Sequence, residues 1–582
     1  MSAAWLDSAE LRVGLGCMRL STDNKSTGEE AVATIAAAAR AGITVFDTAH
    51  SYGRDAGDSG HNERLLVRAL RDCGADGRAR IVTKGGMARE GDHWIPDGRA
   101  KRIRADCEAS LTALDGLEID LYLIHAPDPR TPWLTTVRAL ARLVDDGLVQ
   151  RVGVANVNRR QLEAALTVAD IAAVQVALSP YDDRAIRGGV VELCEGRGIT
   201  VMAHSPLGGP RRAAGLGRRR PLADIAAARG RTPAEIALAW LLDISPAVVP
   251  IPGARHPETA SSAALAAKLR LDDDERAALG RGFGPGGQAR PVRRRSPAGA
   301  EVLLIMGIPG AGKSRVAEQY LAQGYLRLNR DDVGGSLREL ASTLGERIAA
   351  GARRVVLDNT YLTRAARSYV VEAATRHRAS IRCIWLDTPL AQAQVNMVER
   401  LLDRFDSLPA PEEIRQVARR EPGILMPTSQ MRALRELEPP STDEGLAAVE
   451  MVPFSRIAWS DRPRSGVFVA AAALSRPGWE AAIKQGARHS PHLLFDWSPG
   501  GSQEALDEAA VRLSGEVAGL VESAICPHEA GPPSCWCRPP LPGLPLAFAR
   551  AHRLDPSRSM LIGTAPAHRT LAITLGAEYV PI

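Results

Sequence analysis

The first 280 residues alternate short apolar runs with stretches whose apolar positions have the spacing of a helix. Eight such runs follow one another, at residues 13–16, 43–48, 81–84, 121–125, 152–155, 174–176, 199–204 and 248–251. Eight strands that alternate with helices over about 270 residues are typical of a closed (β/α)₈ barrel. We therefore predict an α/β barrel over residues 1–281.

Polar side chains stand at the ends of three neighbouring runs. Asp47, Lys84 and His125 end the second, third and fourth runs, and Tyr52 follows shortly after the second. In such barrels the carboxyl ends of the strands form the active site. These four residues are therefore predicted to converge on one active site at the barrel mouth.

The segments that carry these residues resemble the tetrad of aldo-keto reductases, and the resemblance covers roughly residues 10–280. Further similar segments are 153–156, 205–208 and 251–253. The resemblance implies a reductase site, in which a carbonyl that accepts a hydride needs a proton donor. Tyr52 would donate the proton and Lys84 would assist it, because a tyrosine, with a pKa of about 10, is too weak an acid without a nearby cation. The resemblance also implies that Asp47 holds Lys84 and that His125 orients the carbonyl of a small aldehyde or ketone.

The same resemblance implies a nicotinamide cofactor at the barrel mouth, although the chain has no G-x-G-x-x-G motif there. Asn156 and Gln175 would hold the carboxamide. The pyrophosphate would lie against Ser205, Pro206, Leu207 and Gly208. NADP-binding relatives carry a lysine and a serine where this chain has Gly253 and Ala254, so Arg255 is the local candidate for the 2′-phosphate. Both NADP(H) and NAD(H) remain open.

A phosphate-binding pattern, G-x-x-x-x-G-K-S, occupies residues 307–314 between an apolar run and a helical stretch. A strand, a glycine loop and a helix form the setting of a P-loop. Gly307, Gly310 and Gly312 would let backbone amides surround a phosphate. Lys313 would reach the β- and γ-phosphates of ATP, and the Ser314 hydroxyl would hold Mg²⁺.

The residues after this loop resemble the 5′-kinase domain of polynucleotide kinases. The resemblance implies that Asp331 is the general base and that Asp358 is a second acid near Mg²⁺ or the acceptor. Arg400 and Arg404, on a helix after the third strand, would be lid residues. Phage-type enzymes have an arginine where this chain has Gly334, so the acceptor stays open between a nucleic-acid 5′ end and a small molecule. A plain ATPase is the other alternative.

Four potential zinc ligands crowd near the C-terminus: Cys526, His528, Cys535 and Cys537. Three thiolates and one imidazole suit tetrahedral Zn²⁺. The neighbouring segments 537–543 and 560–564 resemble the haloacid-dehalogenase branch that includes heptose bisphosphate and histidinol phosphate phosphatases. The resemblance implies a Rossmann-like fold with a zinc loop.

The catalytic residues of that phosphatase family are replaced in this chain. The strand that should end in D-x-D reads Val467-Phe468-Val469-Ala470-Ala471-Ala472, and Pro539 and Thr564 stand at the lysine and Mg²⁺-acid positions. Asp461 and Asp496 lie nearby, but neither ends the expected strand. Without a nucleophile no phosphoryl group can be taken from a substrate. We predict an inactive phosphatase fold that is kept for its structure or for a partner.

Chain length and composition indicate how the chain divides into domains. A chain of 582 residues needs several cores, and we predict domains at 1–281, 300–457 and 458–582 with a linker at 282–299. The net charge of +6 is mild and does not by itself argue for nucleic acid. The sequence has no apolar run of the ~20 residues that span a bilayer and no signal-peptide pattern. We therefore expect a cytoplasmic protein without membrane association.

The leading hypothesis is a protein with two activities, a nicotinamide-dependent carbonyl reductase and an ATP-dependent hydroxyl kinase. The order of kinase and phosphatase fold favours repair of nucleic-acid ends. Small-molecule metabolism and a nucleotide-regulated scaffold are the alternatives. Five arginines between residues 208 and 221, namely Arg211, Arg212, Arg218, Arg219 and Arg220, favour an anionic carbonyl substrate such as a phosphorylated aldehyde, although an ordinary basic surface loop has the same pattern.

Overall fold

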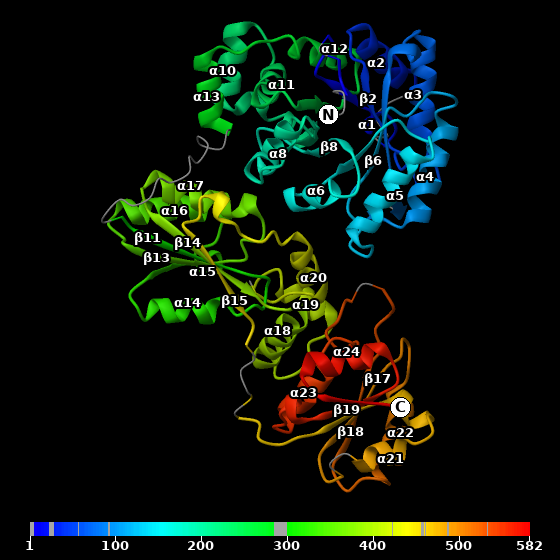
Figure 1. Cartoon of the computed structure of the whole chain (residues 1–582), viewed down its shortest axis with the longest axis vertical. Coiled ribbons are helices and arrows are strands. Elements are labelled where there is room, and N and C mark those ends of the chain that lie inside the picture. The colour runs from blue at the N-terminus through cyan, green and yellow to red at the C-terminus, as the bar shows by residue number, and fades with distance from the viewer. Residues whose placement is uncertain are drawn as a thin grey trace. The chain divides into compact units, whose positions relative to one another are not determined.

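A computed structural model describes residues 5–7, 9–22, 28–55, 57–90, 93–283, 299–421, 423–455, 459, 461–485, 488–531 and 533–582. The chain forms two compact units, Met1–Gln288 and Ala289–Ile582 (Figure 1). The predicted linker, 282–299, lies outside the described residues except for its ends. The last helix of the first unit continues to Phe283, two residues beyond the predicted boundary.

The first unit is built on eight parallel strands. In sheet order they are β1 (Gly14–Gly16), β2 (Val45–Asp47), β3 (Arg80–Gly85), β6 (Leu121–Ile124), β7 (Val152–Ala155), β8 (Ile171–Ala177), β9 (Thr200–His204) and β10 (Val248–Ile251). The two edges meet where the Gly16 amide donates to the Pro252 carbonyl at 3.0 Å. The predicted eight-stranded parallel barrel is confirmed.

Helices surround these strands and explain why the strands are apolar along their whole length. The longer ones are α2 (Gly28–Arg40), α3 (His61–Asp72), α4 (Ala100–Ala113), α5 (Trp133–Asp145), α6 (Arg159–Ala165), α8 (Val190–Arg197), α10 (Arg220–Arg229), α11 (Pro233–Ile244), α12 (Pro257–Ala266) and α13 (Asp273–Phe283). One buried cluster fills the space between helices and strands, and a smaller one, which includes Val82, Leu123 and Met202, fills the barrel interior.

An antiparallel hairpin, β4 (Met87–Glu90) and β5 (His93–Pro96), follows β3 and was not anticipated from the apolar pattern. The short helices α1 (Arg19–Thr22), α7 (Arg184–Arg187) and α9 (Gly209–Ala213) lie in the loops.

The second unit begins with a five-stranded parallel sheet. Its order is β12 (Leu326–Leu328), β13 (Arg354–Asp358), β11 (Glu301–Met306), β14 (Ser380–Asp387) and β15 (Ala448–Pro453). The helices of this part are α14 (Lys313–Leu321), α15 (Arg330–Val333), α16 (Leu337–Ala349), α17 (Arg364–Arg376), α18 (Leu390–Phe405), α19 (Pro411–Val417) and α20 (Pro427–Glu436). The glycine loop directly follows the central strand β11. It therefore lies at the carboxyl edge of the sheet, where other α/β sheets bind phosphate.

A second five-stranded parallel sheet completes this unit. Its order is β18 (Val521–Cys526), β17 (His492–Trp497), β16 (Val467–Ala470), β19 (Met560–Gly563) and β20 (Glu578–Pro581). The helices are α21 (Trp479–Gln485), α22 (Gln503–Ser514), α23 (Gly543–Ala551) and α24 (Pro566–Leu575). Its core is continuous with α18 and α19 of the preceding part.

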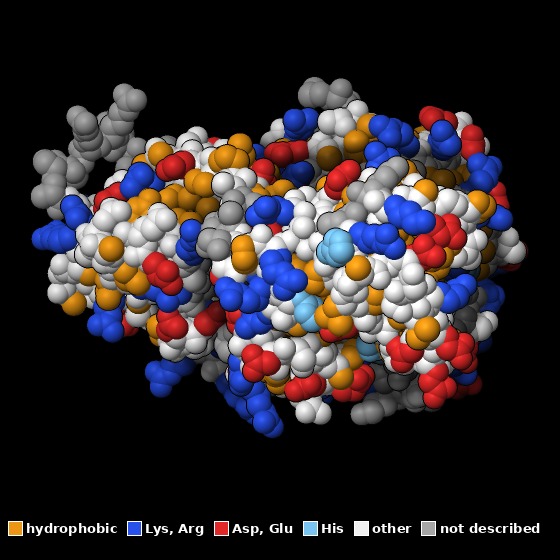
Figure 2. Space-filling model, turned by 90° about the horizontal axis from the view of Figure 1, so that it is seen from below, with side chains coloured by type: hydrophobic (Ala, Val, Ile, Leu, Met, Phe, Trp, Pro, Cys, Tyr) orange, Lys and Arg blue, Asp and Glu red, His pale blue; other side chains and the backbone are white. Residues whose placement is uncertain are grey.

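None of the described helices is long and apolar enough to cross a bilayer. On the face that Figure 2 shows, basic and acidic side chains are intermingled with apolar ones. This mixture agrees with the small net charge of the sequence.

Candidate active sites

The four predicted reductase residues come together at the carboxyl ends of neighbouring barrel strands. Asp47 is the last residue of β2, Lys84 lies near the end of β3, and His125 directly follows β6. Tyr52 lies in the loop after β2, where its ring meets the His125 ring edge-on with centroids 5.6 Å apart. Parallel strands in register bring these positions to one end of the barrel.

Lys84 is the centre of this cluster. Its side chain is fully buried, and its Nζ lies 2.8 Å from both carboxylate oxygens of Asp47. The same Nζ donates to the Thr48 carbonyl at 2.8 Å and to the Tyr52 hydroxyl at 3.3 Å. Burial alone acts to lower the pKa of Lys84, but the Asp47 carboxylate and Tyr52 outweigh it, so the pKa is raised and the ammonium form is kept.

Tyr52 is 6% exposed and is closed in by the edge of Trp94. Burial raises the pKa of Tyr52, because water that would stabilise the phenolate is excluded, while the charge of Lys84 acts in the opposite direction. The sequence argument anticipated the effect of the lysine but not the larger effect of burial. Without bound ligands the tyrosine is therefore a protonated donor held against an ammonium ion.

His125 is held neutral. Burial, then repulsion from Lys84 and His204, lowers the pKa of His125 well below its ordinary value. Its Nδ1 is buried and has no hydrogen-bond partner among the described residues. A neutral imidazole can orient a carbonyl oxygen by hydrogen bonding without competing with Tyr52 as an acid.

The proposed cofactor residues lie beside this cluster. The Asn156 side chain donates to the His125 carbonyl at 3.0 Å, and its Oδ1 lies 3.1 Å from His204 Nε2. Gln175 Nε2 donates to Asp47 Oδ1 at 2.7 Å, which leaves its carbonyl end for another partner. Sequence reasoning missed His204, which ends β9 one residue before Ser205; its position at a strand end was the available signal.

The loop after β9 combines unusual backbone with aromatic and basic side chains. Ser205 has φ 51° and Gly208 has φ 79°, and a Cβ on Gly208 would lie 2.5 Å from the Tyr181 ring. The guanidiniums of Arg212 and Arg219 lie over the same ring at 5.5 and 5.0 Å. Two of the five arginines in the loop are thus engaged by Tyr181. Pro206 and Leu207 lie between the two residues with positive φ, and Arg255 follows β10, where its carbonyl accepts from Thr34.

In the second unit, the glycine loop runs from the end of β11 to the first turn of α14. Lys313 folds back over it, and its Nζ donates to the carbonyls of Gly307 and Ile308, each at 3.0 Å. Removal from water lowers the pKa of Lys313 to about 8; Asp358 and Asp331 oppose this shift, and Arg400 reinforces it. Ser314 is the next residue of the helix and is exposed.

The predicted acids of this site differ in their surroundings. Asp358 ends β13, and its buried carboxylate accepts from Arg327 Nε at 2.9 Å and Nη2 at 2.7 Å. Asp331 lies exposed in the first turn of α15, where its amide donates to the Asn329 side chain. Asp358 would have to leave Arg327 before it could bind Mg²⁺. Asp331 is exposed, so an acceptor hydroxyl could reach it directly.

Residues 390–436, which comprise α18 to α20 and which we call the lid segment, carry both predicted arginines. Arg400 donates to the Gly423 carbonyl at 3.1 Å, and Arg404 pairs with Glu421 at 2.8 Å. Two residues that the sequence did not suggest contact the glycine loop itself. Asn396 donates to the Gly310 carbonyl at 2.7 Å, and Gln430 donates to the Pro309 carbonyl at 2.9 Å. For Gln430 the available signal was a polar side chain on an otherwise apolar helix face, whereas Asn396 has polar neighbours on its helix and the sequence carries no such signal for it.

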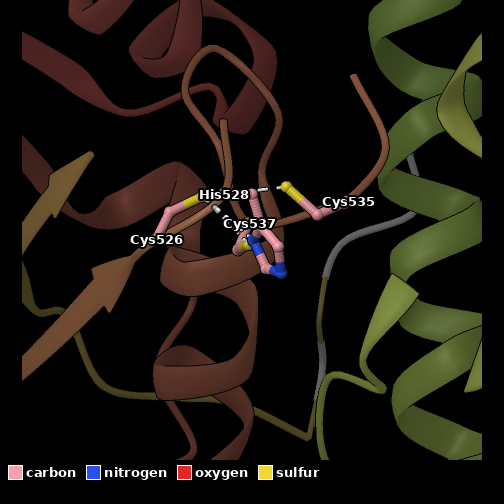
Figure 3. Close-up of side chains that lie close together, drawn as sticks. All are labelled: Cys526, His528, Cys535 and Cys537. Atoms are coloured by element: carbon pink, nitrogen blue, oxygen red, sulfur yellow. Dashed lines mark hydrogen bonds between the residues drawn. The ribbon is translucent and has the colours of Figure 1, made fainter. Parts of the chain in front are cut away.

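The four predicted metal ligands meet in one cluster, and Figure 3 shows their side chains pointing toward one another. Cys526 Sγ lies 3.7 Å from Cys535 Sγ and 3.2 Å from Cys537 Sγ, and His528 Nδ1 lies 3.4 and 3.3 Å from Cys526 and Cys537. Zinc–sulfur bonds of about 2.3 Å place tetrahedral sulfurs about 3.8 Å apart. The donor set and its size therefore fit Zn²⁺.

Comparison with known proteins supports the two nucleotide-dependent parts. Residues 12–281 match the model of the Aldo/keto reductase family, and residues 302–421 match a model described as AAA domain. "Probable aldo-keto reductase 1" of Glycine max is 32% identical over 296 residues, which cover 45% of this chain and 83% of that protein. "Aldo-keto reductase str7" of Strobilurus tenacellus is 29% identical over 280 residues, which cover 43% and 80%. An aldo/keto reductase from Klebsiella pneumoniae, solved in complex with NADP and acetate, is 28% identical over 49% of this chain and 93% of that chain, with a TM-score of 0.41.

Proposed function

Because the chain belongs to the aldo/keto reductase family through residues 12–281, and also carries a P-loop kinase-like domain, we propose that it combines an NADP(H)-dependent carbonyl reductase with an ATP-dependent kinase. The observation that carries the first activity is the single buried ammonium of Lys84, which contacts both Asp47 and the Tyr52 hydroxyl. No simpler structural role requires a phenol and a carboxylate on one buried cation at a barrel mouth.

In the proposed reduction, Tyr52 donates its proton to the carbonyl oxygen of a small aldehyde or ketone. Lys84 stabilises the phenolate that remains, Asp47 holds Lys84 in place, and neutral His125 orients the carbonyl. A reduced nicotinamide supplies the hydride when it is bound. This chain would hold it through Asn156 and the carbonyl end of Gln175, with residues 205–208 at the pyrophosphate. Arg255 is the proposed partner of a 2′-phosphate, which favours NADP(H) over NAD(H).

The reductase proposal is tested with a panel of short aldehydes and ketones and with each reduced cofactor in turn. We expect loss of the nicotinamide absorbance at 340 nm with NADPH in preference to NADH. Changing Arg255 to Ala should raise the KM for NADPH and leave that for NADH unchanged. Failure of every carbonyl together with failure to bind either cofactor would contradict the proposal.

The second proposed activity is transfer of the γ-phosphoryl group of ATP to a hydroxyl. Lys313 would leave the two carbonyls it now contacts and pair with the β- and γ-phosphates, while Ser314 would bind Mg²⁺. Exposed Asp331 is the proposed base for the acceptor hydroxyl, and Asp358 is a second acid once it is released from Arg327. Arg400 and Arg404 would neutralise the transferring group. This proposal is supported by the positions of four residues: Lys313 and Ser314 follow β11, Asp331 follows β12, and Asp358 ends β13 of the same parallel sheet. Arg400 lies close enough to Lys313 to help lower its pKa.

The acceptor that we propose first is the 5′-hydroxyl end of a nucleic acid, because of the resemblance to polynucleotide kinases. A sugar or alcohol is the second candidate, and it is favoured by Gly334 and by the intermingled charges of Figure 2. Incubation with γ-labelled ATP and Mg²⁺ distinguishes the two. A 5′-hydroxyl oligonucleotide, its 5′-phosphorylated twin and a panel of polyols are the acceptors, and label on the first alone supports the nucleic-acid assignment.

For residues 458–582 we propose a haloacid-dehalogenase-like fold with a structural Zn²⁺ and no phosphatase activity. β16 ends at Ala470 and continues into a 3-10 turn of Ala471–Ser475, so an apolar methyl group stands where the nucleophile is needed. Asp496 lies near the end of the neighbouring strand β17 and Asp461 precedes β16. One bound zinc per chain and no turnover of phosphomonoesters are the expected results.

A further inference from the structure

The metal cluster of the second unit carries a tryptophan between two of its ligands. Trp536 stands between Cys535 and Cys537, and its large side chain is only 2% exposed. Its indole Nε1 donates to the Leu425 carbonyl at 3.1 Å, just before α20 of the lid segment. The metal knuckle, residues 526–537, is therefore hydrogen-bonded to the lid segment through Trp536, which lies between two of its ligands.

The side chains around Trp536 come from both halves of the unit. One buried cluster joins the lid segment to residues of the second sheet and its helices; its members include Met397, Leu401, Ile414, Ile424, Phe468, Leu541, Leu546 and Leu571. At its rim Arg462 pairs with Glu399 at 2.6 Å, and Gln392 donates to the Thr574 carbonyl at 3.1 Å. The lid segment thus shares its apolar core with the C-terminal part of the unit.

The opposite side of the same lid segment reaches the glycine loop. Asn396 of α18 donates to the Gly310 carbonyl, and Gln430 of α20 donates to both Pro309 and Ala393 carbonyls at 2.9 Å. The approach is close, because a Cβ on Gly310 would lie 2.5 Å from the Ala393 carbonyl oxygen. Gln430 is fully buried, so its position is fixed by this packing. Any shift of α18 or α20 must therefore move the phosphate-binding backbone.

We propose that the C-terminal part acts as a metal-locked brace for the nucleotide site, with Trp536, Asn396 and Gln430 as its positioning residues. A metal held by the four ligands would fix the knuckle, the knuckle positions Trp536, and Trp536 holds α18 and α20 against the glycine loop. This role accounts for a phosphatase fold that has lost its acids but kept its four metal ligands. This proposal rests on the proposed nucleotide site. It goes beyond that site because it assigns a role in ATP binding to residues that are far from the glycine loop in sequence.

A matched pair of tryptophans provides the test. Trp536→Phe removes the indole hydrogen bond to the lid segment and keeps an aromatic ring in the core. Trp497 makes an equivalent bond, from Nε1 to the His528 carbonyl at 2.9 Å, but is 39% exposed and, among the described residues, forms no hydrogen bond to the lid segment. Trp497→Phe in the full chain is therefore the control for loss of an indole bond beside the metal.

We expect Trp536→Phe to weaken binding of a fluorescent ATP analogue with Mg²⁺ by about five- to tenfold, since one net hydrogen bond and its packing are lost. Metal content and NADPH binding should stay at wild-type values in both variants. The Trp497 control should bind nucleotide normally. Asn396→Ala should also weaken binding of the ATP analogue. The double variant with Trp536→Phe should lose less affinity than the product of the two single losses, because both residues act through the same lid segment.

Linkage gives a second readout that needs no turnover. If the metal supports nucleotide binding, nucleotide must support metal binding by the same factor. Saturating Mg·ATP should therefore raise the equilibrium affinity for zinc, measured by competition with a chromophoric chelator, by about fivefold or more in wild type, and this increase should shrink in Trp536→Phe. Lys313→Ala, which should bind nucleotide poorly, serves as the control that ATP acts through the loop.

The outcomes separate the brace from the proposed kinase. A wild-type chain that does not bind the ATP analogue at all would contradict the nucleotide site itself. A wild-type chain that binds it, together with a Trp536→Phe variant of equal affinity and with zinc affinity unaffected by Mg·ATP, would overturn the brace and leave the kinase proposal standing. Equal weakening by Trp497→Phe would also overturn it, because the effect would then follow from loss of any indole bond beside the metal and not from the contact of Trp536 with the lid segment.

Discussion

Two lysines, one in each unit, stand in opposite electrostatic surroundings. Lys84 in the barrel is fully buried against the Asp47 carboxylate, and its pKa is raised. Lys313 in the glycine loop donates to two backbone carbonyls, and removal from water lowers its pKa to about 8, although Asp358 and Asp331 oppose this shift. Both residues were predicted from the sequence to be the essential cation of an active site, but within the described residues only Lys84 forms an ion pair.

The difference reflects what each site receives from its ligands. The barrel must assist a phenol inside the protein, so the charge that balances Lys84 belongs to the chain and the site is assembled in advance. If the glycine loop binds a polyanion, as proposed, a permanent carboxylate partner for Lys313 would compete with phosphate. The buried carboxylate of Asp358 is instead paired with Arg327. On this proposal the first site is preorganised, and the second is completed by its substrate.

The largest expected effect concerns the barrel. Tyr52→Phe removes the proposed proton donor, so kcat/KM for aldehyde reduction should fall by about 10²- to 10⁴-fold while NADPH binding is unchanged. Tyr122→Phe, which alters a buried phenol on the helix-facing side of β6, should keep normal turnover. Normal turnover of Tyr52→Phe would refute the proposed role of the tetrad.

The next largest effect concerns the glycine loop. Lys313→Ala should reduce phosphoryl transfer from ATP by about 10²- to 10³-fold, which is the loss expected when one group that stabilises transition-state charge is removed. Arg315→Ala, an exposed change on the same helix, should retain activity. Carbonyl reduction should be the same in both variants. If reduction fell together with transfer in Lys313→Ala, the two sites would not be independent as the contrast requires.

The sequence predicted the barrel and the glycine loop, but it did not predict several of the contacts that distinguish the two sites. The apolar runs predicted the barrel because strands covered on both faces are apolar throughout. The P-loop was evident because its glycines and lysine must occupy fixed positions. Other features could not be predicted, because each joins segments that are distant in sequence. They are the Arg327–Asp358 pair, the contacts of Asn396 and Gln430, and the position of Trp536. Their partners are set by tertiary packing, which no local pattern records.

Metal removal should produce a smaller, local effect. Cys535→Ser removes one of four ligands, so zinc content should fall below one per chain and the unfolding temperature of the second unit should drop by about 5 °C or more. The barrel should unfold at its wild-type temperature, as followed by NADPH-dependent protection. Cys73→Ser, a change at a cysteine outside the cluster, is the control. Loss of zinc without any loss of stability would contradict a structural metal.

The smallest expected effect concerns the arginines after β9. All of these arginines are exposed, but Arg212 and Arg219 lie over the Tyr181 ring, which leaves Arg218 and Arg220 as the ones to change. We expect kcat/KM to favour a phosphorylated aldehyde over its unphosphorylated twin by about threefold to tenfold, and this preference should shrink at high salt. Changing Arg218 and Arg220 to Ser should reduce it. Equal use of both aldehydes by the wild type would assign these arginines to ordinary surface.

Proton uptake on ligand binding tests the contrast between the two lysines most directly. In the free chain the pKa of Lys313 is about 8, and phosphate beside it must raise this pKa, so protons are taken up between the two values. At pH 8.5, calorimetry in buffers of different ionisation enthalpy should show uptake of about half a proton or more per Mg·ATP bound. Affinity should fall as the pH rises above about 8, and Lys313→Arg should abolish the uptake. NADPH should take up none at Lys84, which is already charged. Mg·ATP binding whose heat does not depend on the buffer would contradict the account.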